Sequence, residues 1–426
     1  MIKVEEALER ILSAVSVLEE EESPLLEAVG QVLSRDIHSA IDVPPADNSA
    51  MDGFAVQAAS TRGASPASPR VLRVTGQIAA GGRPGGPVGP GEAVRIMTGA
   101  PIPPGADAVV QFEDTDEEVR RRAQDISLSH IGILREASAG LNIRQAGEDI
   151  PRGALVLPRG TVVNPPQVGV LASLGMVRAP VIRRPVVAII GTGDELTPLG
   201  EPLPPGRIYD SNTYALAAQV KRLGAIPRIM GIARDVEADL RDKVRQAAEA
   251  DLVLTSGGVS QGDYDMVKGV LAQEGEMNFW TVSMKPGKPL AFGHFRRGQR
   301  RVPHLGLPGN PVSSMITFAV FGRPAVLKMM GKGTAPLPTV EAVMEEEVTN
   351  RDGRRYYARV SLSRRSGQYH ARLSGPQGSG ILSSMAQADG LAIIPEDTTR
   401  VRAGDRVQVM LLEWSQEKPS LSQERG

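Results

Sequence analysis

Residues 251–265, DLVLTSGGVSQGDYD, bring together groups that can bind an anion and a metal ion. Residues 252–255 predict a buried strand, and the glycines that follow, Gly257 and Gly258, end it. At the rim of a parallel sheet, glycine N–H groups are open to an anionic ligand because no Cβ covers them. The carboxylates just beyond, Asp265 among them, could bind a metal ion or a hydroxyl or amine group of the ligand. The alternative is a tight loop whose aspartates cap a helix.

Other polar loops follow the neighbouring strands of this segment. The string at 191–196, GTGDEL, follows an apolar strand but matches a dinucleotide fingerprint only weakly, because its third glycine is missing. Lys285 and Lys288 lie in KPGKP, a loop that two prolines restrict. Because the carboxyl ends of parallel strands share one edge of a sheet, we expect these loops to meet. The carboxylates expected at that edge are Glu195, Asp235 and Asp265.

This combination favours an anion site with an oxygen-liganded metal ion. A restricted loop loses little entropy when its lysines bind an anion. Several carboxylates would repel a phosphate unless Mg²⁺ bridges them; alternatively, they bind neutral donors such as ribose hydroxyls or the N–H groups of a heterocycle. The sequence shows no nucleophile–histidine arrangement, which disfavours covalent catalysis. These residues therefore indicate phosphoryl or anhydride chemistry that is assisted by a metal ion and by positioning.

The composition excludes several classes of function. The 426-residue chain has 48 basic and 49 acidic side chains and a net charge of −1, which argues against nucleic acid as the main partner. It has no cysteine, so disulfides, thiolate metal sites and cysteine nucleophiles are ruled out. No apolar run approaches the roughly 20 residues that span a bilayer, and the N-terminus lacks a signal pattern. We expect a cytoplasmic protein with no membrane partner.

The patterning changes along the chain, whose length predicts two to four domains. Helical periodicity predicts an amphipathic helix at 4–18 and a shorter one at 25–37. Short strands rich in Val, Thr, Gly and Pro predict a β domain at 41–149. Strand–helix alternation over 185–331 predicts a largely parallel sheet with helices on both faces. Residues 336–414 return to short strands, as in a small β-barrel or sandwich.

Several strings occur in one order along nearly the whole chain, to about residue 413. They are PPADNSAMDGFA (44–55), IMTGAPIPPGADAVV (96–110), RQAGEDI (144–150), GTGDEL (191–196), TSGGVSQGDYD (255–265), KPGKPLAFG (285–293) and LPGNPVSS (307–314). Together they resemble the molybdopterin molybdotransferase family of the MoeA type, to which the gephyrin E domain also belongs. Ala46, Phe54 and Gln261 depart from the residues frequent in that family, but none of them removes a charged group.

The resemblance implies a multidomain α/β plus β fold with four subdomains per chain. Subdomain I is expected to be split between residues 1–40 and 150–180 and to be helical or mixed, and subdomain II is expected to be β-rich and to span 41–149. Subdomain III, at 181–330, would be a three-layer α/β/α molybdopterin-binding domain. Subdomain IV, at 334–413, would be a β-barrel, and residues 414–426 would form a polar tail. Family members are homodimers whose active cleft lies between the α/β domain of one subunit and the second subdomain of its partner.

The resemblance also implies an activity, which is a step of molybdenum cofactor biosynthesis. A molybdopterin molybdotransferase inserts molybdate into adenylylated molybdopterin. The dithiolene sulfurs take the metal, and the phosphoanhydride is cleaved with Mg²⁺ to release AMP. A transient contact with the molybdopterin adenylyltransferase is a further expected partnership. The sequence does not separate molybdate from tungstate, since both are tetrahedral oxyanions.

The resemblance assigns residues to this site from several parts of the chain. The expected catalytic residues are Asp52, Thr98, Arg144, Asp149, Glu195, Asp235, Asp265, Lys285 and Lys288. The expected substrate-binding residues are Gly257, Gly258, Ser260, Pro289, Ser313, Arg359 and Ser379. Among these, Lys285, Lys288 and Ser313 would bind the oxyanion, with Arg359 and Ser379 completing a molybdate pocket. The expected Mg²⁺ ligands are Glu195, Asp235 and Asp265.

Two other functions remain open from the sequence. The α/β domain alone resembles the molybdopterin adenylyltransferase, which uses ATP, but that single-domain family lacks the NSAMDG and GEDI strings. A receptor-clustering scaffold is the second alternative, because the gephyrin E domain has that role. The charged motif residues are intact, which favours catalysis.

Overall fold

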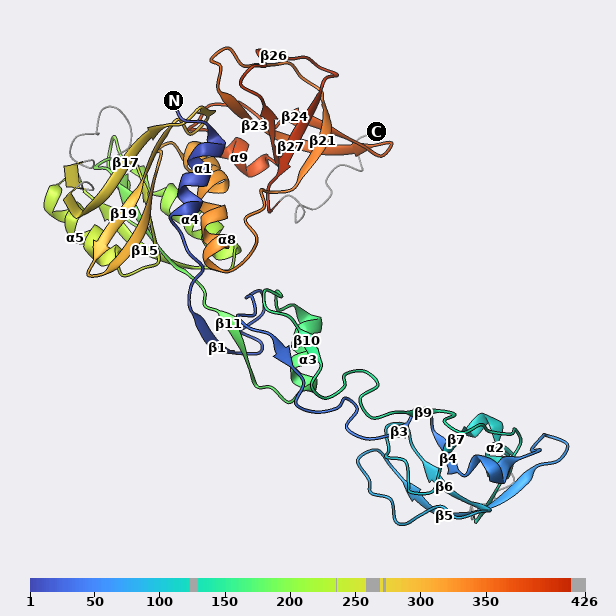
Figure 1. Ribbon diagram of the computed structural model, residues 1–426. Helices are drawn as coiled ribbons and strands as arrows, with labels where there is room; N and C mark the ends of the chain where they lie inside the picture. Colours follow the sequence, from blue (N-terminus) through green and yellow to red (C-terminus); the bar gives the residue numbers. More distant parts are fainter. Residues whose placement is uncertain (123–128, 235, 258–268, 271–272, 415–426) are drawn as a thin grey trace. The chain divides into compact units, whose positions relative to one another are not determined.

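The computed structural model describes residues 1–122, 129–234, 236–257, 269–270 and 273–414, which form two compact units (Figure 1). Unit 1 contains the described residues of 1–22, 30–34 and 180–426, and unit 2 contains those of 23–29 and 35–179. No helix among the described residues is long and apolar enough to cross a membrane. Asp235, Gly258, Ser260 and Asp265 lie outside the described residues.

The described residues of unit 1 include a six-stranded mixed sheet. Its strands are β12 (Val186–Thr192), β15 (Ile226–Ala233), β16 (Leu252–Ser256), β17 (Gly275–Thr281), β19 (Pro289–Arg297) and β20 (Arg300–Leu307). Their order is β15–β12–β16–β20–β19–β17. The first four strands in this order are parallel to one another, whereas β19 is antiparallel to both β20 and β17. The largely parallel sheet predicted from strand–helix alternation is therefore confirmed.

Helices cover both faces of this sheet. One face carries α1 (Val4–Ser13), α4 (Ser211–Arg222), α7 (Pro311–Thr317) and α8 (Arg323–Met329), and the other carries α5 (Glu237–Ala247) (Figure 1). Val187 and Ile189 of β12 pack on the first face, while Ala188 and Ile190 pack on the second. A strand that is buried on both faces needs an uninterrupted apolar run, which is what the sequence provides. The expected three-layer α/β/α domain is confirmed.

Two helices begin at the carboxyl edge of the sheet. The side chain of Asp210 caps α4 by accepting a hydrogen bond from the Thr213 N–H at 3.1 Å. Pro311 occupies the first position of α7, where proline needs no N–H partner. A π-helical segment, η3 (Phe318–Gly322), joins α7 to α8. The first turns of α4 and α7 therefore lie near the ends of the parallel strands, although several of their N–H groups already have partners: the Thr213 N–H donates to Asp210 and the Val312 N–H to the Ser379 carbonyl.

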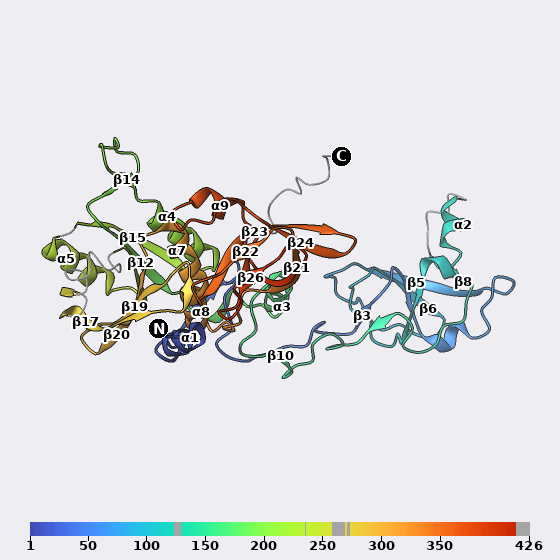
Figure 2. The ribbon, with the colours of Figure 1, turned by 90° about the horizontal axis from the view of Figure 1, so that it is seen from above.

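A closed β-barrel follows the α/β domain (Figures 1 and 2). Its strands are β21 (Thr339–Met344), β23 (Arg355–Arg365), β24 (Gln368–Leu373), β25 (Gly390–Ile394) and β27 (Arg406–Leu411), with β22 (Val348–Thr349), β26 (Arg400–Val401) and the helix α9 (Leu382–Gln387) between them. The order is β23–β24–β21–β27–β25, and pairing of β25 with β23 closes it. β18 (Met284–Lys285) runs parallel to β23, so that Lys285 pairs with Tyr356. This pairing attaches the barrel beside the carboxyl edge of the sheet.

Unit 2 is mainly β structure, as predicted for residues 41–149. Its five-stranded sheet has the order β7 (Ala108–Gln111), β4 (Gly53–Val56), β6 (Glu92–Ile96), β5 (Arg70–Ile78), β8 (His130–Ile133). The other elements of unit 2 are β2 (Ile37–His38) paired with β10 (Leu155–Leu157), β3 (Asn48–Ser49) paired with β9 (Ile143–Arg144), η1 (Ala58–Thr61), η2 (Phe112–Asp114), α2 (Glu117–Arg122) and α3 (Pro165–Ser173). β1 (Glu20–Pro24) pairs with β11 (Arg178–Ile182), and each of these two strands has residues in both units. The proline pair opens α3, as predicted.

The N-terminal segment differs from its prediction. The first helix ends at Ser13, and the glutamate run beyond it begins β1 instead of continuing the helix. The helix predicted at 25–37 is wrong: this segment forms turns, with Gly30 at a φ of +81°, and Leu33 bridges to Val181. Apolar side chains of α1 pack in the core of the α/β domain, and residues 1–22 belong to unit 1. The subdomain boundaries, including those of the split subdomain I, stay predictions.

The buried carboxylate of Asp251 stabilises the start of the sheet through hydrogen bonds. Both terminal nitrogens of Arg183 donate to Asp251 at 2.7 Å, and the Val186 N–H donates to it at 2.9 Å. Asp251 is 6% exposed. Asparagine would remove the buried charge that pairs with Arg183 and Arg300, while Arg183 keeps its ion pair with the exposed Glu19 at 2.8 Å. We therefore expect Asp251→Asn to lower the free energy of unfolding by about 1–3 kcal/mol.

Denaturant unfolding monitored by circular dichroism measures this effect. The matched control is Glu249→Gln, because Glu249 pairs with Arg297 at 2.8 Å while both side chains stay about half exposed. We expect the control to lose less than about 1 kcal/mol. Equal losses in the two variants would contradict a structural role for the Asp251 ion pair.

Candidate functional site

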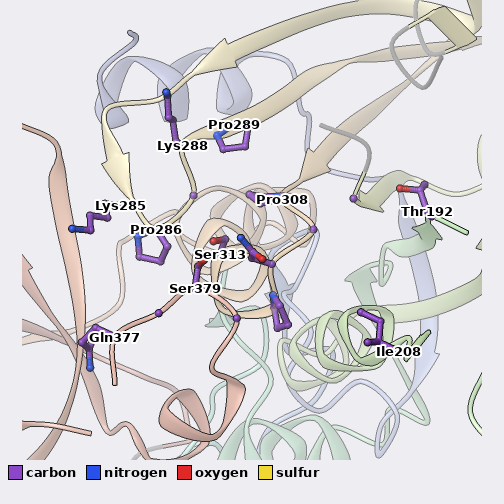
Figure 3. Close-up of a pocket in the computed structure, with 18 of the residues that line it drawn as sticks. Thr192, Ile208, Lys285, Pro286, Lys288, Pro289, Pro308, Ser313, Gln377 and Ser379 are labelled. Carbon is purple, nitrogen blue, oxygen red and sulfur yellow. The ribbon is translucent and has the colours of Figure 1, made fainter. Parts of the chain in front are cut away.

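A cavity of about 820 Å³ lies at the carboxyl edge of the sheet, next to the barrel. Figure 3 shows that residues of the α/β domain, such as Lys288 and Ser313, and residues of the barrel, Gln377 and Ser379, surround the same space. Seven of the predicted site residues line it: Glu195, Gly257, Lys285, Lys288, Pro289, Ser313 and Ser379. The convergence of the strand-end loops that the sequence predicted is therefore confirmed.

The glycine rim lies at the end of β16, where the backbone makes a close approach. Gly257 has a φ of +101°, and a Cβ added to it would lie 2.7 Å from both the carbonyl oxygen and the Oγ1 of Thr192. The Thr192 hydroxyl in turn donates to the Ser256 carbonyl at 3.2 Å. Only glycine fits this position without a shift of the backbone, because the conformation and the contact both exclude a side chain.

Asn212 connects two loops at this edge of the sheet through hydrogen bonds. Its Nδ2 donates to the Ser256 Oγ at 2.9 Å and to the Gly309 carbonyl at 2.7 Å. One amide on the first turn of α4 therefore connects the end of β16 with the loop before α7. Asp210 is the cap of α4, whereas Asn212 fixes the spacing of the strand ends.

The lysine loop is shaped by a second close contact. Gly287 has a φ of +103°, and a Cβ there would lie 2.5 Å from the Thr317 Oγ1 on α7. The Lys285 ammonium lies 4.7 Å from the centroid of the Tyr356 ring, a distance that permits a cation–π interaction. Lys288 is exposed, and among the described residues no carboxylate pairs with its ammonium. Two lysines with different surroundings thus border the cavity.

The barrel contributes a loop that meets the start of α7. The Val312 N–H donates to the Ser379 carbonyl at 3.1 Å, which places Ser379 beside Ser313, the third residue of α7. Ser313 is 4% exposed. Its hydroxyl is a donor for an anion in the cavity, whereas the neighbouring N–H groups of Val312 and Ser314 already donate to the carbonyls of Ser379 and Asn310.

Arg359 lies beneath this loop. It is fully buried, its Nη2 donates to the carbonyls of Pro376 and Gly378 at 2.9 and 3.1 Å, and its N–H donates to the Gln377 Oε1 at 2.8 Å. Burial lowers the pKa of the Arg359 guanidinium. Arg359 therefore supports the wall of the cavity and is absent from its lining, whereas we had expected it to bind molybdate directly.

The four predicted residues of unit 2 lie outside the part of the chain that lines the cavity. Asp52 Oδ1 accepts hydrogen bonds from the N–H of Thr98 at 2.7 Å and from its hydroxyl at 2.8 Å, and these bonds lower the pKa of Asp52. Arg144 in β9 pairs with Asn48, and the Asp149 N–H donates to the Val43 carbonyl at 3.0 Å. All four side chains are exposed.

The described residues provide few ligands for a metal ion. Glu195 is the carboxylate among the described lining residues, and no group of three His, Asp or Glu side chains in the described part of the chain is arranged to hold a metal. Mg²⁺ is commonly bound by one or two carboxylates together with substrate phosphates and water. A single carboxylate beside anion-binding groups fits that pattern.

A buried histidine supports the strands behind the cavity. His304 on β20 is fully buried, and its Nε2 lies 3.1 Å from the Thr255 Oγ1 on β16. Burial lowers the pKa of His304 from its ordinary value of 6.5 to about 3. The folded protein therefore holds the neutral ring, whereas the unfolded chain takes up a proton below about pH 6.5. Stability from this group is present above pH 6.5 and is lost as the pH falls towards 3.

We expect His304→Gln to flatten the pH dependence of stability in that window. The wild type should lose up to about 1.4 kcal/mol of unfolding free energy per pH unit more than the variant. Urea unfolding at a series of pH values between 7 and 4 measures the two slopes. The exposed His38 allows a matched control, His38→Gln, which should keep the wild-type slope. Identical slopes in all three proteins would contradict this assignment.

Comparison with known proteins decides the family. Three family models match in order: the MoeA N-terminal region (domains I and II) at residues 2–175, a probable molybdopterin-binding domain at 188–328, and the MoeA C-terminal region (domain IV) at 341–412. Molybdopterin molybdenumtransferase 2 of Mycobacterium tuberculosis is 39% identical over 393 residues, which cover 91% of this chain and 93% of that protein. This chain belongs to the molybdopterin molybdenumtransferase family.

Other members of the molybdopterin molybdenumtransferase family agree. The Bacillus subtilis protein of that name is 33% identical, over 96% of this chain and 94% of its own length. A crystal structure of the MoeA protein of Pyrococcus horikoshii matches with a TM-score of 0.81 and 34% identity, and covers 96% of this chain and 99% of that one. The family that the sequence motifs indicated is therefore confirmed, and so is the fold class.

The sequence did not point to all residues of the cavity. Arg354, Tyr356 and Gln377 line it beside the predicted ones. They lie at the start of β23 and in a barrel loop, and no strand-end motif marks either place. The pairing of β18 with β23 brings Arg354 and Tyr356 to the lysine loop. Their place in the cavity could be predicted from the sequence only if this pairing of distant strands were already known.

Proposed function

We propose that this chain is a molybdopterin molybdenumtransferase that inserts molybdate into adenylylated molybdopterin, with Mg²⁺-dependent release of AMP. The observation that carries the proposal is the cavity at the sheet edge, where two lysines, the glycine rim and the start of α7 surround one space. Both molybdate and the phosphoanhydride of the substrate are anionic, so this donor set suits both. Membership in the family supports the metal-insertion chemistry.

The proposed oxyanion site lies between the lysine loop and the start of α7. Lys288 and Lys285 supply positive charge, and Ser313 supplies a hydroxyl donor next to the helix N-terminus. Ser379 adds a donor from the barrel loop, which Arg359 holds from below. The cavity is large enough, at about 820 Å³, to hold a small oxyanion beside a much larger ligand.

The proposed place of the adenylylated pterin is the glycine rim. The Gly257 N–H itself donates to the Leu307 carbonyl at 3.1 Å, so other backbone N–H groups of this rim would bind the phosphates. Glu195 would hold Mg²⁺ next to these phosphates, and Asp235 and Asp265 would complete the ligand set; Gly258 and Ser260 would also contact the substrate. When bound, the ion would neutralise charge on the phosphoanhydride. Pro289 limits the movement of the lysine loop.

Several further assignments stay predictions. We propose a homodimer in which Asp52, Thr98, Arg144 and Asp149 serve the site of the partner subunit. Exposed apolar side chains on unit 1, including Ile208, Tyr209, Tyr214, Ile226 and Ile229, offer a surface for self-association. A cytoplasmic location and a transient contact with the molybdopterin adenylyltransferase complete this proposal. Sedimentation over a range of protein concentrations tests the dimer.

The activity is tested by single-turnover release of AMP. The purified protein is mixed with adenylylated molybdopterin, molybdate and Mg²⁺, and AMP and the metal-loaded cofactor are quantified. We expect both products in equal amounts, and neither when molybdate is left out. Formation of adenylylated molybdopterin from ATP, with no metal insertion, would instead support the adenylyltransferase function.

A further inference from the structure

An acidic side chain stands beside one of the two lysines of the cavity. The Lys285 ammonium lies 3.9 Å from the Asp352 Oδ2, while the Tyr356 ring lies on another side of it at 4.7 Å. Asp352 precedes β23 and is absent from the cavity lining. Lys288 has no such partner among the described residues. The two lysines of one loop therefore differ in their charge environment.

Arg354 holds this carboxylate in place. Its Nη2 forms an ion pair with the Asp352 Oδ2, and its N–H donates to the Asp352 Oδ1 at 3.4 Å. A further bond from the Arg354 Nη1 to the Met284 carbonyl, at 3.4 Å, links the same side chain to β18. Partial burial opposes ionisation of Asp352, but the Arg354 hydrogen bond and the nearby charges lower its pKa. The carboxylate is consequently charged at neutral pH.

We propose that Asp352 is an internal counter-ion of Lys285 that competes with the incoming oxyanion for the lysine ammonium. The inference rests on the proposed function, because it takes the oxyanion to bind at the lysine loop. A carboxylate 3.9 Å away offsets part of the charge that Lys285 presents to the cavity, and it shares its Oδ2 between Lys285 and the closer Arg354. An entering dianion must draw the ammonium away from Asp352, which weakens binding and speeds release.

In this arrangement the two lysines have different roles in binding the oxyanion. Lys288 attracts the oxyanion, since no described carboxylate offsets its charge. Lys285 exchanges its contact with the Asp352 carboxylate for a contact with the entering oxyanion. The Tyr356 ring limits where the Lys285 ammonium can move. Asp352 is thus an affinity-determining residue that acts through Lys285 and need not touch the substrate.

The test measures binding of tungstate, a tetrahedral dianion, by isothermal titration calorimetry at low ionic strength. We expect Asp352→Asn to lower the Kd of the full-length protein by about threefold to tenfold, because it removes one offset to the charge of Lys285. The gain should shrink at high salt. The matched control is Glu341→Gln, which removes the same charge from an exposed pair with Arg406 in the barrel and should leave the Kd unchanged.

A second set of measurements, in the Lys285→Met variant, shows whether Asp352 acts through Lys285. In Lys285→Met protein, adding Asp352→Asn should produce little further gain, because the lysine through which the carboxylate acts is gone. Unchanged or weaker binding by the Asp352→Asn single variant would overturn the inference alone, as would a full gain in the Lys285→Met background. Absence of binding by wild type and variant alike would overturn the oxyanion site, and the inference with it.

Discussion

Replacing Lys288 with alanine is expected to reduce kcat/KM for molybdate by about 10²- to 10³-fold. The ammonium borders the cavity, is exposed, and has no carboxylate partner among the described residues, so its charge is available to a dianion. Removing it takes away a positive charge at the edge of the cavity that no described carboxylate offsets. Molybdate titrations of AMP release at a fixed concentration of adenylylated molybdopterin measure the effect.

The control for this variant is Lys221→Ala, in which a lysine on α4, remote from the cavity lining, is lost. It should retain wild-type kinetics. Circular dichroism spectra and sedimentation should be the same for both variants. A molybdate titration of Lys288→Ala that overlays the wild-type curve would remove Lys288 from the oxyanion site.

Replacing Gly257 with alanine is the second large expected effect. The added Cβ would lie 2.7 Å from the Thr192 carbonyl oxygen, and the φ of +101° is unfavourable for any residue with a side chain. The backbone must shift, which moves the N–H groups that are proposed to bind the substrate phosphates. We expect kcat/KM for the adenylylated substrate to fall about 10²-fold, and the free energy of unfolding to fall by about 1–3 kcal/mol.

Gly169→Ala provides the matched control. Gly169 lies within α3, and an added Cβ there meets nothing within 4 Å. Alanine favours a helix more than glycine does, so this variant should be as active as wild type and more stable by about 0.5–1 kcal/mol. Full activity of the Gly257→Ala protein would contradict the role of the glycine rim.

Local patterns were enough to predict most of the α/β domain. The run Val187–Ile190 is apolar on both faces, and only a strand covered on both sides explains it. Asp210 and Pro311 marked the starts of α4 and α7 because capping and proline preferences act within one turn. Once these elements alternate, the loops at one edge must meet, so the sequence predicted Gly257, Lys285 and Ser313 as neighbours.

Other features depend on contacts between distant parts of the chain. Residues 25–37 have apolar spacing that suits a helix, but Leu33 bridges to Val181, and Gly30 turns the chain. The position of Arg359 under the barrel loop follows from bonds to residues 376–378 and not from any local motif. Tyr356 reaches the cavity because β18 pairs with β23. Long-range pairing of this kind overrides local preference and leaves no local signal.

A crystal of the protein soaked with tungstate tests the central claim most directly, because tungsten gives strong anomalous scattering. We expect an anomalous peak in the cavity of unit 1, within hydrogen-bonding reach of the Lys288 ammonium, the Ser313 hydroxyl and the barrel loop at Ser379. A well-diffracting soaked crystal with no anomalous peak in this cavity, and with the Lys288 side chain directed into solvent, would contradict it.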